Sequence, residues 1–114
     1  MPIVPSSTAP CDIDCPIRRA DSILGGKWTT LIFRELFAGT RRYSQLQRAL
    51  PGISPRVLAE RLRKLEAEHL LTRKVIPDIP PKTEYTLTKK GKQVKGVLQA
   101  MAKFGASLRE GAAA

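Results

Sequence analysis

Apolar residues recur at helical spacing in the first part of the chain, and glycines divide them into two segments. A spacing of about 3.6 predicts a helix over residues 16–24, with Cys15 before it as a candidate capping residue and Gly25 at its end. A second helix is predicted over residues 27–37, where apolar residues cover almost every side, as is typical of a centrally buried helix. Trp28 is therefore interpreted as a core residue rather than a platform for base stacking.

Residues 44–68 are predicted to form two short helices joined by a tight turn. Ser44, with Gln47 three residues later, predicts a capping box at the start of the first helix. Pro51 stops that helix, because proline cannot continue it and disfavours helical geometry at the residue before it. Ser54, followed by a proline, then starts the second helix, because its hydroxyl can accept from the free N–H groups.

The second of these helices, about residues 55–68, is amphipathic and basic. Its apolar face carries Leu58, Leu62 and Leu65. The opposite face carries Arg56, Glu60 and Arg63, with Arg61 and Lys64 toward the flank. Two helices at this spacing, the second one cationic, are typical of a module that lays one helix in the DNA major groove.

After residue 70 the pattern changes to short, β-branched runs, which predict strands over residues 71–76 and 83–87. The expected inward positions are Val75, Tyr85 and Leu87. Residues 77–82 join the strands and contain three prolines, so this loop is expected to project as a stiff hairpin tip. A hairpin directly after a recognition helix is a wing. Its positive charges come from Arg73, Lys74 and Lys82.

Helical spacing returns over residues 89–108, with Thr88 as the capping residue. A broad apolar stripe holds Val94, Val97, Leu98, Met101, Phe104 and Leu108. This stripe is wider than one small core would absorb, so we expect the first and last helices to form a two-fold dimer interface. Lys89 and three further lysines occupy the first turns, where positive charge opposes the helix dipole. They indicate either a nearby phosphate backbone or a solvated basic face.

The order of these elements predicts a mainly α fold of the α+β class. It is a winged helix-turn-helix with a two-stranded wing and an extra helix at each end. Residues 1–14 are rich in Pro, Ser and Thr and are expected to form a flexible arm. Residues 15–110 are expected to form one domain for DNA binding and dimerisation.

Charge narrows the choice of partner. The chain has 114 residues and a net charge of +10, which implies nucleic acid, an anionic membrane or an acidic protein as partner. A merely soluble basic protein is the alternative. Residues 41–64 hold seven basic residues and one acidic residue, so most of the excess lies in and just before the helix pair.

The sequence carries no evident signal for another destination or for catalysis. No signal peptide or membrane-spanning stretch is visible, and two Cys with one His make neither a disulfide framework nor a zinc site. We therefore expect a cytoplasmic protein without metal or cofactor. No catalytic triad, paired carboxylates or Gly-rich phosphate loop is evident, and His69 is interpreted as the residue that ends the recognition helix. An enzyme is not expected.

Four segments together resemble one known family. They are residues 15–36 (CPIRRADSILGGKWTTLIFREL), 39–43 (GTRRY), 50–71 (LPGISPRVLAERLRKLEAEHLL) and 80–91 (PPKTEYTLTKKG). In this order and spacing they resemble the HxlR-type bacterial transcription regulators, relatives of the MarR group, over about residues 15–105. The resemblance implies a homodimeric winged-helix protein that controls transcription in response to small electrophiles, oxidants or metabolites. It does not indicate the regulated gene, the effector, or repression as opposed to activation.

DNA contacts divide into base readout and backbone positioning. Base readout is assigned to Ser54, Arg56, Val57, Glu60 and Arg63. Arg56 is the first choice, because its paired donors match the O6 and N7 acceptors of guanine. Glu60 either accepts from a cytosine amino group or pairs with Arg56 or Lys64 one turn away. Phosphate contacts are assigned to Arg42, Arg63, Lys64, Lys82 and Lys89.

Cys15 lies where several members of that family carry a cysteine that senses oxidants or electrophiles. A thiol at the positive end of a helix, with two arginines one turn on, has the setting of a reactive cysteine, although Asp12 and Asp14 oppose it. Cys11 is a candidate resolving thiol, within the chain or across the dimer. The alternative is that Cys15 is a small buried residue with no redox role.

Two further functions are considered. A winged-helix module that binds an acidic protein should present an acidic or apolar DNA-side face, but this face is basic. Sequence-indifferent coating of DNA or RNA is the second. Few aromatic residues are available for stacking on single strands, which argues against that form of coating.

Overall fold

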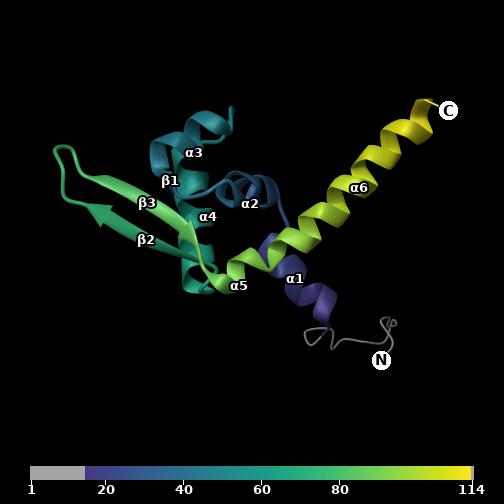
Figure 1. Ribbon diagram of the computed structural model, residues 1–114, viewed down its shortest axis with the longest axis horizontal. Helices are drawn as coiled ribbons and strands as arrows, with labels where there is room; N and C mark the ends of the chain where they lie inside the picture. Colours follow the sequence, from purple (N-terminus) through teal and green to yellow (C-terminus); the bar gives the residue numbers. More distant parts are fainter. Residues whose placement is uncertain (1–14, 114) are drawn as a thin grey trace.

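The structure is a computed structural model that describes residues 15–113. Its elements, in chain order, are α1 (Pro16–Leu24), α2 (Thr29–Phe37), β1 (Arg41–Arg42), α3 (Tyr43–Ala49), α4 (Pro55–Ala67), β2 (Leu71–Ile76), β3 (Lys82–Leu87), α5 (Lys89–Lys92) and α6 (Val94–Ala113). Figure 1 shows α2, α3 and α4 gathered at the base of the β2–β3 hairpin, which projects to one side while α6 extends to the other. The predicted winged-helix architecture is confirmed.

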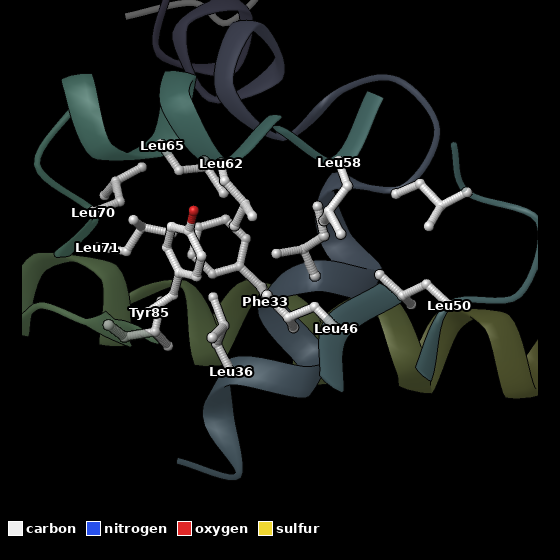
Figure 2. Close-up of a cluster of buried hydrophobic side chains, with 13 residues drawn as sticks. Phe33, Leu36, Leu46, Leu50, Leu58, Leu62, Leu65, Leu70, Leu71 and Tyr85 are labelled. Atoms are coloured by element: carbon white, nitrogen blue, oxygen red, sulfur yellow. The ribbon is translucent and has the colours of Figure 1, made fainter. Parts of the chain in front are cut away.

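The core lies where α2, α3 and α4 meet the base of the hairpin (Figure 2). Phe33 is fully buried at its centre, as the apolar pattern of the second helix predicts. The predicted leucine face of α4 is also confirmed. The buried apolar residues are Ile32, Phe33, Leu36, Leu46, Leu50, Ile53, Leu58, Leu62, Leu65, Leu70, Leu71, Tyr85 and Leu87.

The start of α2 differs from the prediction. The helix begins at Thr29, because Trp28 has a left-handed backbone with φ of 86° and so lies outside the helix. Trp28 packs against the core but is only partly buried. A Cβ built at Gly52 would lie 3.7 Å from its ring, and the Lys27 ammonium lies 5.0 Å from the ring centroid. The indole therefore sits at the edge of the core, beside the turn between α3 and α4.

The sheet has three antiparallel strands in the order β1-β3-β2, so the sequence missed one strand. β1 is only two residues long, which is too short to show a period, and it pairs Arg41 with Tyr85. The predicted inward position of Val75 is wrong, since its side chain is 49% exposed. The predicted inward positions of Tyr85 and Leu87 are confirmed. The hairpin extends beyond the core, so its buried residues, Leu71, Tyr85 and Leu87, lie toward its base.

The predicted capping box at Ser44 and Gln47 is wrong by two residues. The helix α3 starts at Tyr43, directly after β1, and the Gln45 side-chain oxygen accepts from the backbone N–H of Arg42 at 2.8 Å. The strand β1 decides where α3 starts. Its extended backbone runs to Arg42, so the free N–H groups of the first helical turn come directly after that residue.

The end of α4 is set by a left-handed residue. His69 has φ of 62°, its N–H donates to Glu66 O at 2.9 Å, and the N–H of Leu70 donates to Leu65 O at 2.9 Å. This is the Schellman arrangement, normally built on glycine. The His69 carbonyl in turn accepts from the Thr88 hydroxyl at 2.7 Å. The prediction that His69 ends the helix is confirmed, and its backbone makes these bonds.

The last helix is divided, which the sequence did not predict. Thr88 caps its first turn as predicted, with its hydroxyl accepting from the Gly91 N–H at 3.0 Å. That turn, α5, ends at Lys92, and α6 begins after Gln93. The Gln93 N–H donates to the Lys90 carbonyl at 3.1 Å, a tightened hydrogen bond over three residues.

Candidate nucleic-acid interface

The helix α4 is held at both its start and its buried side. The Ser54 hydroxyl accepts from the Val57 N–H at 3.1 Å, as predicted, and Pro55 occupies the first helical position. The Tyr43 hydroxyl donates to the Pro55 carbonyl at 2.9 Å, which fixes the start of α3 to the start of α4. Sequence reasoning missed this role of Tyr43. A tyrosine at the start of the first helix of the pair was the available signal.

Opposite the buried leucines, α4 presents a polar face of three residues, Arg56, Glu60 and Arg63, which we call the reading face. The Arg56 side chain is 86% exposed, and its Nε lies 3.3 Å from Glu60 Oε2. The ion pair that the sequence offers as an alternative role for Glu60 is therefore present in the free protein. An exposed pair of this kind contributes about 0–1 kcal/mol, so a better partner can displace it.

One flank of α4 makes contacts with the rest of the protein, although Lys64 on it is exposed. The Lys64 ammonium donates to the carbonyl of Ser22 near the end of α1. Arg61 Nε donates to the carbonyl of Lys27 at 3.4 Å. Val57, one turn earlier, is partly buried against the core. The structure therefore separates Val57 and Lys64 from the reading face, although all of them were grouped as DNA contacts from the sequence.

Arg42 and Lys82 lie on either side of one hollow. This hollow, about 360 Å³ in volume, is lined by Arg42, Tyr43, Ser44, Pro80, Pro81, Lys82 and Thr83. Arg42 is exposed, and Lys82 Nζ lies 3.4 Å from Asp78 Oδ2. Lys82 is the first residue of β3 rather than part of the loop. The tip end of the wing, where β3 begins, and the start of α3 thus form one basic site.

Lys89 lies apart from that site. It is exposed in α5, beyond the far end of β3 from Lys82. Six residues of strand span roughly 20 Å, so Lys82 and Lys89 cannot contact the same phosphate. Positive charge is therefore present at both ends of the strand (Figure 1).

Tyr85 supports the base of the wing from inside. It pairs with Arg73 across β2 and β3 and with Arg41 across β1 and β3. Burial raises the pKa of Tyr85 above its ordinary 10.0, and Arg73 opposes that rise in part. The phenol is consequently neutral at physiological pH, so the nearby arginines keep their full charge for an outside partner.

Cys15 is the N-cap residue of α1 and is partly buried. Its thiol makes no capping hydrogen bond. Its backbone carbonyl accepts from the Arg19 N–H at 3.0 Å. Cys11, the candidate resolving thiol, lies outside the described residues. Within residues 15–113 no cluster of three potential metal ligands occurs, and none of the helices there is long and apolar enough to span a membrane.

Comparison with known proteins agrees with this geometry. The sequence profile of the family described as HxlR-like helix-turn-helix matches residues 23–112. An uncharacterised HTH-type transcriptional regulator of Synechocystis is 47% identical over 96 residues, which cover 84% of this chain and 71% of the relative. The HTH-type transcriptional regulator YodB of Bacillus subtilis is 41% identical over 88 residues, covering 76% of this chain and 79% of YodB.

Solved structures show the same similarity in three dimensions. A transcriptional regulator of the MarR family from Porphyromonas gingivalis superposes with a TM-score of 0.79 at 40% identity, covering 83% of this chain and 93% of that one. The redox regulator HypR in its reduced form superposes with a TM-score of 0.78 at 34% identity, covering 82% and 93%.

Proposed function

This chain belongs to the HxlR-like helix-turn-helix family of transcription regulators, and we propose that it acts by binding a specific double-stranded DNA site as a homodimer. The observation that carries the proposal is the reading face of α4. Arg56, Glu60 and Arg63 project from a helix whose other side is locked by buried leucines. A rigid helix that presents polar side chains in this way suits the major groove.

The positions of the side chains support the following assignment of DNA contacts. Arg56 leads base readout, and Glu60 accepts from a base once Arg56 has left it. Ser54, which caps α4, and Val57, on the flank, contribute to base contacts only at the start of the helix. We expect phosphates to be contacted beside the wing tip by Arg42 and Lys82, along α4 by Arg63 and Lys64, and beyond β3 by Lys89.

The test compares two duplexes at fixed salt. One is recovered by repeated selection from a random-sequence library, and the other is the unselected random duplex. We expect the selected duplex to bind at least about 10³-fold more tightly, as specific regulators do. Equal binding of both duplexes would instead identify a sequence-indifferent coating protein, and binding of neither would point to a protein-interaction module.

Arg56→Ala is expected to cost about 1–3 kcal/mol of binding to the selected duplex and to relax the preference at one base position. The guanidinium is lost together with its paired donors, whereas the fold loses only an exposed ion pair with Glu60. Binding titrations against duplexes that vary one base pair at a time measure the effect.

Lys82→Ala is the matched control for that experiment. It should weaken binding to selected and random duplexes alike and reduce the slope of log affinity against log salt by about one unit. If both variants lose discrimination between bases equally, the division between reading and positioning residues is wrong.

The homodimer is supported by apolar surface that the protomer does not bury. Ile17 on α1, and Val97, Met101, Phe104 and Leu108 on α6, are all exposed. A hollow of about 400 Å³ between the two helices is lined by Ile17 and Met101 among others. Two-fold symmetry implies an inverted repeat, with half-sites one helical turn apart or a multiple of that.

Redox control through Cys15 is the regulatory part of the proposal. Two similar solved structures are named for redox states, the regulator HypR in reduced and in oxidised form. A peroxide would oxidise the Cys15 thiolate to a sulfenic acid as its O–O bond breaks and water leaves. The Cys11 thiol would then displace a second water to form a disulfide, so the two thiols together lose two electrons.

Cys15→Ser is expected to abolish the loss of DNA binding that mild peroxide causes in the unaltered protein. The hydroxyl is nearly isosteric with the thiol but cannot form the sulfenic acid. Intact-mass spectrometry before and after peroxide, with DNA binding measured on the same samples, provides the check. An unmodified Cys15 and unchanged binding in the unaltered protein would leave Cys15 as a structural residue.

A further inference from the structure

The tip of the wing carries an apolar side chain that the fold does not use. Ile79 is 97% exposed, and it lies between Pro77 and Asp78 on one side and Pro80 on the other. Burying a whole isoleucine side chain contributes about 1.5–3 kcal/mol. None of that free energy stabilises this protomer, so it is available to a contact made outside it.

The tip is held in one shape. Asp78 Oδ1 accepts from the Ile79 N–H at 2.9 Å, and Asp78 Oδ2 lies 3.4 Å from Lys82 Nζ. Pro80 directly follows Ile79 and restricts its backbone, and Pro77 restricts the chain two residues earlier. Ordering this loop on binding therefore costs little conformational entropy. The same contacts neutralise Asp78, the acidic residue of the tip, at close range.

The surroundings of the tip match DNA rather than an apolar protein surface. Pro80, the residue after Ile79, lines the basic hollow together with Arg42 and Lys82. Arg73 and Lys74 are exposed on β2 of the same hairpin. An apolar tip set in front of basic side chains has the charge pattern needed to pass between two phosphate strands.

We propose that Ile79 is an apolar wedge that enters the DNA minor groove and partly unstacks one base step, so that the duplex bends toward the major groove. This proposal rests on the proposed DNA-binding function. Isoleucine and proline are among the side chains that act in this way in other minor-groove proteins. Because pyrimidine–purine steps unstack most easily, the wedge would favour such a step at a fixed distance from the bases read by α4.

Ile79→Ser tests the wedge, with Val75→Ser on the same hairpin as the matched control. Val75 is also exposed and apolar but lies on the strand rather than at the tip. The probe is the duplex selected from the random library, labelled at its two ends for energy transfer. We expect Ile79→Ser to lower affinity about tenfold, to remove the protein-induced bend and to leave the salt slope unchanged. Val75→Ser should change none of these.

The outcomes separate the wedge from the DNA-binding function itself. If the unaltered protein binds the selected duplex but Ile79→Ser binds and bends it equally well, the wedge is wrong and the function stands. A changed salt slope would also overturn the wedge, because it would place the tip on phosphates. If the unaltered protein prefers no duplex, the proposed sequence-specific DNA binding is wrong, and the wedge that depends on it is wrong as well. Thermal melting of both variants checks that the fold is intact.

Discussion

Gly91→Ala lowers the free energy of unfolding by about 3 kcal/mol or more. A Cβ at this position would lie 2.0 Å from the carbonyl oxygen of Leu70 and 3.2 Å from Leu87 Cδ2. Overpacking of a core usually costs about 1–3 kcal/mol, but here the nearest atom is backbone, which cannot rotate away. Thermal melting should show a fall of at least about 10 °C.

The Leu70 carbonyl has no freedom to retreat. The Leu70 carbonyl accepts from the Thr88 N–H at 3.0 Å. The Leu70 N–H donates to Leu65 O in the turn that ends α4. Gly91 thus lies where the end of α4 meets the start of α5. A shift large enough to admit a methyl group would disturb the hydrogen bonds on both sides.

Gly96→Ala is the matched control, because its added Cβ would meet nothing within 4 Å. It should leave stability unchanged or raise it by up to about 1 kcal/mol, since alanine is the better helix former. Helix propensity alone predicts the same gain at both glycines. A neutral or stabilising Gly91→Ala would therefore show that the close approach to Leu70 is not rigid.

Local sequence patterns predict those elements of the fold that are long enough for the spacing of their apolar residues to repeat. The leucines of α4, the apolar sides of α2 and the Ser54 cap all depend on neighbours within a few residues, and each was predictable. The features that were missed depend on residues distant in sequence. The position of Arg42 as the N-cap of α3, with Gln45 accepting from its N–H, follows from the pairing of β1 with β3. The left-handed turn at Trp28 has no residue pattern that signals it.

The candidate site shows the same division. Periodicity places Arg56, Glu60 and Arg63 on one face, and the structure has them there. Periodicity cannot tell that Lys64 bonds to α1, because that contact depends on how the elements pack. It also cannot tell that Lys82 pairs with Asp78, because that contact depends on the conformation of the wing loop.

Phe104→Glu is expected to convert the proposed homodimer to a monomer and to reduce affinity for the selected duplex on the order of 10²–10⁴-fold. The Phe104 ring is 65% exposed in the protomer, so its loss leaves the protomer core intact. In the proposed dimer, with the apolar side of α6 at the interface, a charge at this position would be buried without a partner. Because two linked recognition helices gain affinity from effective concentration, separating them loses that gain without altering one direct DNA contact.

Gln99→Glu supplies the control, since it adds the same charge to an exposed position of α6 away from the apolar stripe. Sedimentation should give two copies per particle for this variant and for the unaltered protein, but one for Phe104→Glu. Far-ultraviolet circular dichroism of all three checks the helices. If Phe104→Glu remains a dimer with full affinity, the two recognition helices are joined through another surface. If it becomes monomeric yet keeps its affinity, a single α4 with its wing accounts for the binding, and the inverted repeat is not required.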